Sequence, residues 1–146
     1  MKKFVLFDLD NTVVDSLHLK PLRDQRRWED VYSKIETVKL FEGIIELWAA
    51  LRSLKVHLGV VTHSPGKYAR KILAHVELAP DTLVAYRDLD RKLKPSPHGY
   101  RLGCKGRSPQ CGIAVGDERN DLHAADAFGC AGVFAGWSRA PLLTAC

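Results

Sequence analysis

Two aspartates stand two residues apart at the end of the first apolar run, which reads FVLFDLD at residues 4–10. In an extended chain, residues i and i+2 point to the same side, so the carboxylates of Asp8 and Asp10 are expected in one pocket. Neighbouring carboxylates repel each other unless a cation neutralises them or one of them holds a proton. The pair therefore predicts a metal site or a coupled acid and base, with a purely structural turn as the alternative.

A second polar group, Thr62-His63-Ser64, directly follows the apolar run at residues 56–61. A hydroxyl beside the N-terminus of a helix is an arrangement that favours phosphate. The alternative is that Thr62 or Ser64 simply caps the following helix, and for Ser64 the capping role is the one we expect.

A lysine between prolines is the third candidate. Lys94 stands in the sequence LKPSP at residues 93–97, where the prolines restrict the backbone and favour one direction for the ammonium group. A fixed cation suits a transferring phosphoryl group. An isolated loop lysine is, however, usually a solvated charge. Lys94 is therefore a candidate site residue only in combination with the other motifs.

The fourth group is acidic and follows a glycine turn in the sequence IAVGDERND at residues 113–121. Asp117 and Asp121 offer hard oxygen ligands, which suit Mg²⁺. Asp121 is also placed to cap the next helix, and both roles can hold together. The cysteines and histidines show no pairs at the spacing of a transition-metal site, so oxygen ligands are expected for any metal.

The elements that position these groups alternate between short apolar runs and longer segments of helical periodicity. This alternation predicts an α/β fold, a doubly wound parallel sheet of about five strands with helices on both faces. Ligands bind at the carboxyl ends of such strands, which is where the polar groups stand. The expected strands are 4–9, 56–61, 82–86, 113–115 and 132–134.

Three expected helices follow from apolar spacing and from proline positions. Residues 44–54 carry apolar side chains at helical spacing, and Ser64-Pro65 is expected to open a second helix with Tyr68 and Ile72 on its apolar side. Pro97 is expected to open a short third helix that ends near Leu102.

The segment from Val13 to Leu40 does not follow the strand–helix alternation. We interpret residues 1–146 as a single domain in which 13–40 form a reduced helical insertion, either one amphipathic helix or a short helical pair. Its apolar side is predicted to consist of Trp28, Val31, Tyr32 and Ile35.

Three arginines of this insertion, Arg23, Arg26 and Arg27, could grip an acidic leaving group or a nucleic acid backbone. Acidic residues are interspersed among them, so a solvated helix face is the interpretation we favour. The net charge of +5 permits an anionic partner without specifying one. No signal sequence and no run of roughly 20 apolar residues is found, so a cytoplasmic protein without membrane contact is expected.

The four groups in this order resemble the motifs of the haloacid dehalogenase superfamily of phosphohydrolases. The corresponding stretches are FDLDNT at residues 7–12, VVTHS at 60–64, KP at 94–95 and GDERND at 116–121. The resemblance covers nearly the whole chain, and it implies the Rossmann-like fold of that family with a minimal cap at residues 13–40.

By this resemblance, Asp8 attacks phosphorus and forms an aspartyl-phosphate, while Asp10 protonates the leaving alcohol and later activates water. Thr62 and Lys94 then hold phosphate oxygens. His63 stands where relatives often carry asparagine, and it is expected to contact phosphate or substrate.

The implied cofactor is Mg²⁺. Its ligands by resemblance are the Asp8 carboxylate, the Asp10 backbone carbonyl and Asp117, with Asp121 as a supporting acid. Magnesium-dependent hydrolysis of a phosphate monoester is the function that these roles imply.

Several alternatives remain open from the sequence. The acid at Asp10 favours a phosphatase over a dehalogenase, whereas a phosphomutase uses the same motifs. A non-catalytic signalling module that binds phosphate and magnesium, and a nucleic-acid end phosphatase, are further alternatives, although a small phosphorylated substrate is favoured. The short cap suggests a bulky substrate, a homo-oligomer that completes the cap, or low selectivity.

Overall fold

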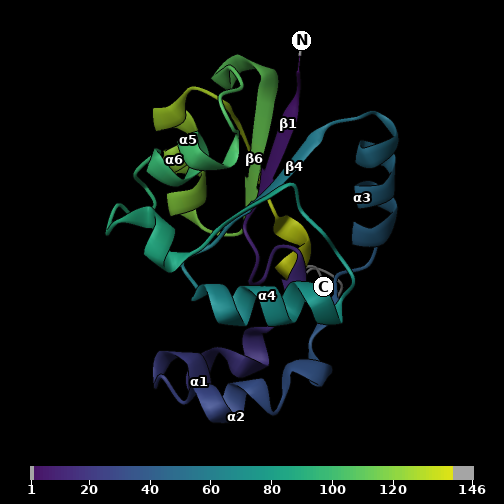
Figure 1. Cartoon of the computed structure of the whole chain (residues 1–146), viewed down its shortest axis with the longest axis vertical. Coiled ribbons are helices and arrows are strands. Elements are labelled where there is room, and N and C mark those ends of the chain that lie inside the picture. Colours follow the sequence, from purple (N-terminus) through teal and green to yellow (C-terminus); the bar gives the residue numbers. More distant parts are fainter. Residues whose placement is uncertain (1, 140–146) are drawn as a thin grey trace, which may run out of the picture.

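The computed structural model describes residues 2–139, and its centre is a sheet of five parallel strands (Figure 1). The strand order is β5-β4-β1-β6-β7, with β1 and β4 paired from Phe4↔His57 to Phe7↔Val60. The predicted doubly wound parallel sheet is therefore confirmed. The strands are β1 (Phe4–Phe7), β4 (His57–Val61), β5 (Thr82–Val84), β6 (Gly112–Gly116) and β7 (Ala131–Phe134).

Helices cover both faces of this sheet because alternate side chains of the central strand are apolar in both directions. Val5 and Phe7 join the core under α3 and α4, while Phe4 and Leu6 join a second core under α5 and α6. Figure 1 shows α5 and α6 on one side of the strands and α3 on the other, with α4 between the strands and the segment that carries α1 and α2. The helices are α3 (Ile44–Ser53), α4 (Gly66–His75), α5 (His98–Gly103) and α6 (Arg119–Phe128).

Two strands end earlier than predicted. The first was expected to reach Leu9 and ends at Phe7, because the Leu9 carbonyl instead accepts the backbone N–H groups of Thr12, Val13 and Val14 in a tight turn. The third was expected to reach Tyr86 and ends at Val84. In both places the apolar character of the sequence continues into a turn, which periodicity alone does not mark.

Residues 13–40 form a small separate layer beyond α4 (Figure 1). A two-stranded antiparallel ribbon of β2 (Val14–Asp15) and β3 (Lys39–Leu40) ties the two ends of the segment together. The predicted helical pair is present, whereas strands of two residues leave no periodicity from which to predict them. The helical elements are η1 (Leu17–Leu19), α1 (Lys20–Asp24), α2 (Trp28–Tyr32) and η2 (Ile35–Thr37).

The apolar side predicted for this segment packs against the body of the protein. Val31 is fully buried, and Trp28, Tyr32 and Ile35 are partly buried against the same core. The ring of Trp28 lies 5.9 Å from the ring of Tyr68 on α4. The remaining short elements are η3 (Tyr86–Leu89), η4 (Pro109–Cys111) and η5 (Gly136–Arg139), and no helix within residues 2–139 is long and apolar enough to cross a membrane.

Candidate active site

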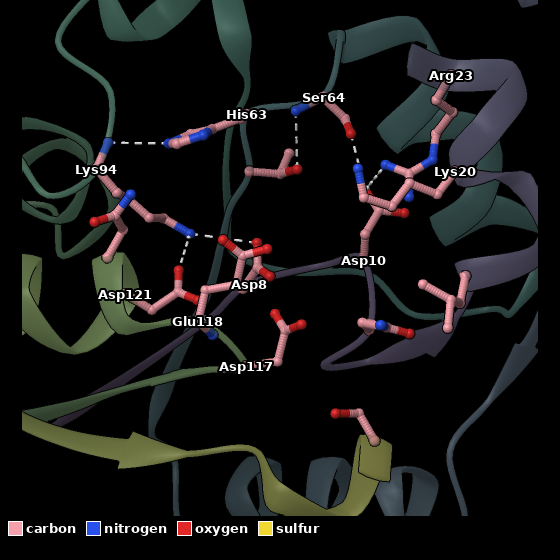
Figure 2. A pocket seen from close by; sticks show the side chains of 15 residues that line it. Asp8, Asp10, Lys20, Arg23, His63, Ser64, Lys94, Asp117, Glu118 and Asp121 are labelled. Carbon is pink, nitrogen blue, oxygen red and sulfur yellow. Dashed lines mark hydrogen bonds and ion pairs between the residues drawn. The ribbon is translucent and has the colours of Figure 1, made fainter.

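A cavity of about 570 Å³ opens where the carboxyl ends of β1, β4 and β6 meet (Figure 2). Parallel strands bring residues that are distant in sequence to this one edge. All the site residues predicted from the sequence line the cavity: Asp8, Asp10, Thr62, His63, Lys94, Asp117 and Asp121.

Asp8 is the first residue after β1 and lies at the centre of the cavity floor. Its backbone N–H donates to the Val115 carbonyl at 2.9 Å, which continues the strand pairing and fixes where the side chain begins. Its carboxylate lies 3.3 Å from the Lys94 ammonium, and the hydroxyl of Thr12 donates to it at 3.4 Å. The side chain is 15% exposed, so it is open to a ligand from one direction only.

Lys94 is buried and fully paired. Its ammonium donates to the Val61 carbonyl at 2.9 Å and to the Asp121 carboxylate at 2.7 Å, in addition to its contact with Asp8. Burial disfavours the charged form, but the two carboxylates outweigh it and raise the pKa of Lys94 above its ordinary value. The ammonium is therefore a fixed positive charge in the cavity.

Asp8 and Asp121, the two acids paired with this ammonium, form a cluster with a third carboxylate, Asp117. One oxygen each from Asp8, Asp117 and Asp121 lies within 4.8 Å of the others. Burial raises the pKa of the Asp8 carboxyl well above its ordinary value; the Lys94 ammonium opposes the rise, and repulsion from Asp121 adds to it. Burial, with Asp121, also raises the pKa of Asp117.

The charges of this cluster do not balance. The cluster contains three carboxylates, and one ammonium pairs with two of them, which leaves an excess of about two negative charges when all are ionised. Carboxylate oxygens at this spacing are hard ligands of the kind Mg²⁺ takes, and a divalent cation would neutralise the excess. The donor set therefore fits the predicted metal.

Gly116 allows the first turn of α6 to close onto the strand before it. A Cβ atom at this position would lie 2.2 Å from the Asp121 side-chain carboxyl carbon, so any larger residue would displace that carboxylate. One Asp121 oxygen accepts the Glu118 backbone N–H at 3.0 Å, and the other accepts from Lys94. Asp121 thus both caps the helix and lies in the charged cluster, as predicted.

Asp10 lies in the same cavity but in a different environment. Its carboxylate accepts hydrogen bonds from Ser16 at 2.6 Å, from the Tyr68 hydroxyl at 2.6 Å and from Ser64 at 2.8 Å. Arg23 completes the set with an ion pair at 3.1 Å. Figure 2 shows the side chain directed toward Ser64 and Arg23, away from Asp8.

Thr62 and His63, which directly follow β4, also line the cavity. The Thr62 hydroxyl oxygen accepts the backbone N–H of Ser64 at 3.1 Å, and Thr62 itself is buried. His63 accepts the backbone N–H of Lys94 at 2.9 Å through Nε2. That contact links the end of β4 to the Lys94 loop, a positioning role that the sequence did not indicate.

The family comparison agrees with this geometry. Residues 18–135, well over half of the chain, match the family described as haloacid dehalogenase-like hydrolase. The chain belongs to this family. The resemblance drawn from the four motifs is thereby confirmed, and the short segment at residues 13–40 is consistent with a minimal cap.

Curated relatives of this chain are named as phosphatases. It is 30% identical over 115 residues to the phosphoglycolate phosphatase of Shigella boydii, a match that covers 75% of this chain and 45% of the relative. It is 34% identical over 89 residues to the N-acetylmuramic acid 6-phosphate phosphatase of Pseudomonas putida, covering 59% and 40%. The chain thus spans less than half the length of the curated relatives it matches.

Solved structures share the fold at lower identity. CbbY from Rhodobacter sphaeroides in complex with phosphate gives a TM-score of 0.80 at 20% identity, covering 92% of this chain and 86% of that one. A hydrolase from Streptococcus pneumoniae gives 0.70 at 17% identity, covering 99% and 100%. At these identities the likeness supports the Rossmann-like fold of the family.

Two expectations about individual residues were wrong. Ser64 was expected to cap α4, but Pro65 holds the N-cap position and Ser64 donates its hydroxyl to Asp10 instead. Arg23 was expected on a solvated helix face, but its side chain is only 16% exposed and pairs with Asp10. The solvated interpretation holds for Arg27, which is 56% exposed in an ion pair with Asp30.

Sequence reasoning also missed Ser16 and Tyr68 as partners of Asp10. Tyr68 was predicted on the apolar side of α4, and its ring is indeed buried, but its hydroxyl extends past that core to the carboxylate. Burial and the nearby Asp10 raise the pKa of Tyr68, so the hydroxyl keeps its proton and donates. No local signal distinguishes such a tyrosine from an ordinary core residue.

Proposed function

We propose that this chain is a magnesium-dependent phosphatase that hydrolyses a phosphate monoester of a small molecule through an aspartyl-phosphate on Asp8. The observation that carries the proposal is the buried Lys94 ammonium between Asp8 and Asp121, beside the three-carboxylate cluster. The names of the curated relatives, phosphoglycolate phosphatase and N-acetylmuramic acid 6-phosphate phosphatase, support a small phosphorylated substrate.

In the first half-reaction, an Asp8 carboxylate oxygen forms a bond to phosphorus while the bond from phosphorus to the leaving oxygen breaks. Asp10 gives a proton to that oxygen, and the alcohol departs. In the second half-reaction, a water oxygen bonds to the phosphorus of the aspartyl-phosphate while the bond from phosphorus to the Asp8 oxygen breaks. Asp10 takes up a proton of that water, phosphate leaves, and the Asp8 carboxylate is regenerated. Asp8 and Asp10 line one cavity, as this alternation requires.

Lys94 has two tasks in this scheme. Its ammonium lies 3.3 Å from the Asp8 carboxylate, so it favours the ionised, nucleophilic form. It also lies where a phosphoryl oxygen beside Asp8 would meet a positive charge, and the Thr62 hydroxyl on the same cavity wall offers a second donor.

The metal would be held by the carboxylates of Asp8, Asp117 and Asp121, with the backbone carbonyl of Asp10 as a further ligand. When bound, Mg²⁺ would neutralise the excess carboxylate charge and the negative charge of the phosphate. The orientation of the substrate and the proton transfers remain the work of Lys94, Thr62 and Asp10.

Residues 13–40 act as a reduced cap of a single domain in this proposal. Three of them, Leu17, Lys20 and Arg23, line the cavity beside the core residues. The cap therefore forms the wall that faces the leaving group, while the core holds the phosphate.

Phosphate release from para-nitrophenyl phosphate tests the proposal. We expect steady turnover with Mg²⁺, loss of turnover on adding a chelator, and no turnover by Asp8→Asn. Binding of phosphate and magnesium without turnover would reject an enzyme in favour of a signalling module. Turnover that persists in Asp8→Asn would reject the covalent route.

A further inference from the structure

A second and larger hollow lies directly beside the active-site cavity. Its volume is about 890 Å³, and Arg23 and His63 line both hollows. Its walls come from the cap around α1, from the first turns of α4, and from η3. A leaving group that extends from a phosphate at Asp8 past Arg23 therefore enters this hollow.

The walls of this hollow are strongly basic, and we call it the basic groove. Its cations are Arg23, Arg26, Lys67, Arg70 and Arg87, against the two acids Asp24 and Asp88. Both acids already have partners: Asp24 pairs with Lys20 at 2.9 Å, and Asp88 accepts the Ala85 backbone N–H at 2.9 Å.

Three of the arginine side chains have no ionic partner among the described residues. Within residues 2–139, the guanidinium groups of Arg26, Arg70 and Arg87 make no ion pair and no hydrogen bond, and all three residues are exposed. Lys67 lies over the Tyr32 ring at 4.9 Å, an interaction that leaves its charge intact. Guanidinium groups form paired hydrogen bonds with phosphate, so unpaired arginines around one hollow favour a phosphate ligand.

Part of the groove is lined by aromatic and apolar side chains. Trp28, Pro65 and Tyr86 line it, and Tyr86 is about half exposed, at 48%. A volume near 900 Å³ is that of a small-molecule site, in contrast to the extended basic surface along which a nucleic acid lies. The positive charge, the aromatic lining and the volume of the groove together favour a compact organic anion as its ligand.

We infer that the basic groove binds a second phosphate on the leaving-group side of the substrate, so that bisphosphorylated small molecules are preferred over simple monophosphates. This inference rests on the proposed function, because it assigns the other end of the same substrate. Contacts between the groove and the second phosphate add binding energy away from the reacting phosphorus. This binding energy raises kcat/KM.

Two matched esters test the groove. Butyl phosphate and butane-1,4-diol bisphosphate differ only in the second phosphate. The longer hexane-1,6-diol bisphosphate increases the distance between the two phosphates. We expect kcat/KM for the better bisphosphate to exceed that for butyl phosphate by at least about tenfold, the effect of one charge-assisted contact. In the double variant Arg70→Gln/Arg87→Gln this ratio should fall toward one.

Arg101→Gln is the matched control, because Arg101 is an exposed arginine on α5 outside both hollows, and it should keep the wild-type ratio. A ratio near one in the wild type, or a ratio unchanged in the double variant, would overturn the inference. A salt-sensitive preference for a 5′-phosphorylated oligonucleotide over both bisphosphates would also overturn it.

Binding to Asp8→Asn separates this inference from the proposed function. Calorimetry with the same esters should show the bisphosphate binding at least about tenfold more tightly than butyl phosphate, and the two groove substitutions should remove that difference. If wild-type protein releases no phosphate from any ester, the proposed function fails while the binding result still decides the groove. If both esters are hydrolysed and bound equally, only the groove inference fails.

Discussion

Asp8 and Asp10 are separated by one residue, yet they belong to two regions that are built differently. The partners of Asp8 come from the core: Lys94 lies in the loop after β5, and Asp117 follows β6. Three of the four partners of Asp10 come from the layers outside the sheet, with Ser16 and Arg23 on the cap and Tyr68 on α4, while Ser64 lies in the turn after β4.

This difference predicts different dependence on the cap. The Asp8 region is arranged by the strand order itself, and its positive charge is buried. The Asp10 region exists only where the cap packs against α4, through contacts such as the Trp28 ring against Tyr68. Changes in the cap should therefore alter the acid–base role proposed for Asp10 while leaving the residues around Asp8 in place.

The largest effect is expected from Asp8→Asn. Loss of the nucleophile should lower phosphate release by at least about a thousandfold. Because burial raises the pKa of Asp8, ionising its carboxyl costs more in the folded protein than in the unfolded chain, and asparagine removes that cost. In chelator at pH 7, the thermal midpoint should be equal to or higher than that of the wild type. A clearly lower midpoint would contradict the charge imbalance described for this region.

The next effect is expected from Lys94→Ala. Its ammonium holds together Asp8, Asp121 and the Val61 carbonyl, so we expect a loss of about a hundredfold to a thousandfold in kcat. Removal of a buried partner leaves carboxylates uncompensated, at a cost of about 3–5 kcal/mol in the free energy of unfolding. Lys92→Ala, an exposed lysine of the same loop, is the control for urea unfolding and turnover.

Magnesium affinity should fall as pH is lowered, and the fall should begin above the ordinary carboxyl range. The raised pKa values of Asp8 and Asp117 mean that protons compete with the metal at higher pH than they would at isolated aspartates. Calorimetric Mg²⁺ titrations between pH 5 and 8, in buffers of different ionisation enthalpy, should show proton release on binding. A pH-independent affinity without proton release would exclude this coupling.

The smallest effect is expected at the cap side. Tyr68→Phe removes one hydrogen bond to Asp10 and should lower kcat on the order of tenfold, part of the effect of a positioned acid. The free energy of unfolding should fall by only about 1 kcal/mol. Tyr32→Phe keeps a cap ring outside the Asp10 contacts and is the matched control. An equal loss in both variants would show a general effect of the cap.

The pH dependence of kcat tests whether Tyr68 positions Asp10. If Tyr68 positions Asp10, the Tyr68→Phe variant should shift the pH dependence of kcat, whereas a merely structural role would lower kcat equally at every pH. The Tyr32→Phe profile should overlay the wild type.

Much of the fold could be predicted because the strands are short apolar runs with helices between them. All five parallel strands lie where the apolar runs predicted them, with ends displaced where a turn begins inside an apolar stretch, as at Leu9. The ribbon of β2 and β3 could not be predicted, since two residues per strand leave no periodicity and their pairing depends on the chain returning from the cap.

The candidate site divides in the same way. The residues that follow strand ends, such as Asp8, Thr62 and Asp117, could be collected from the sequence because parallel strands carry their ends to one edge. Ser16, Arg23 and Tyr68 could not, because their hydroxyl and guanidinium groups reach Asp10 only when the cap packs on α4.

The sequence by itself determined the four motifs, the alternation of strands and helices, and therefore the meeting of Asp8, Lys94 and Asp117 at one edge. Only the tertiary structure decided that Asp10 turns toward the cap and that unpaired arginines gather beside it. The physical reason is that motif spacing sets which strand ends carry charge, whereas the direction of each side chain is set by the donors that packing brings within hydrogen-bonding distance.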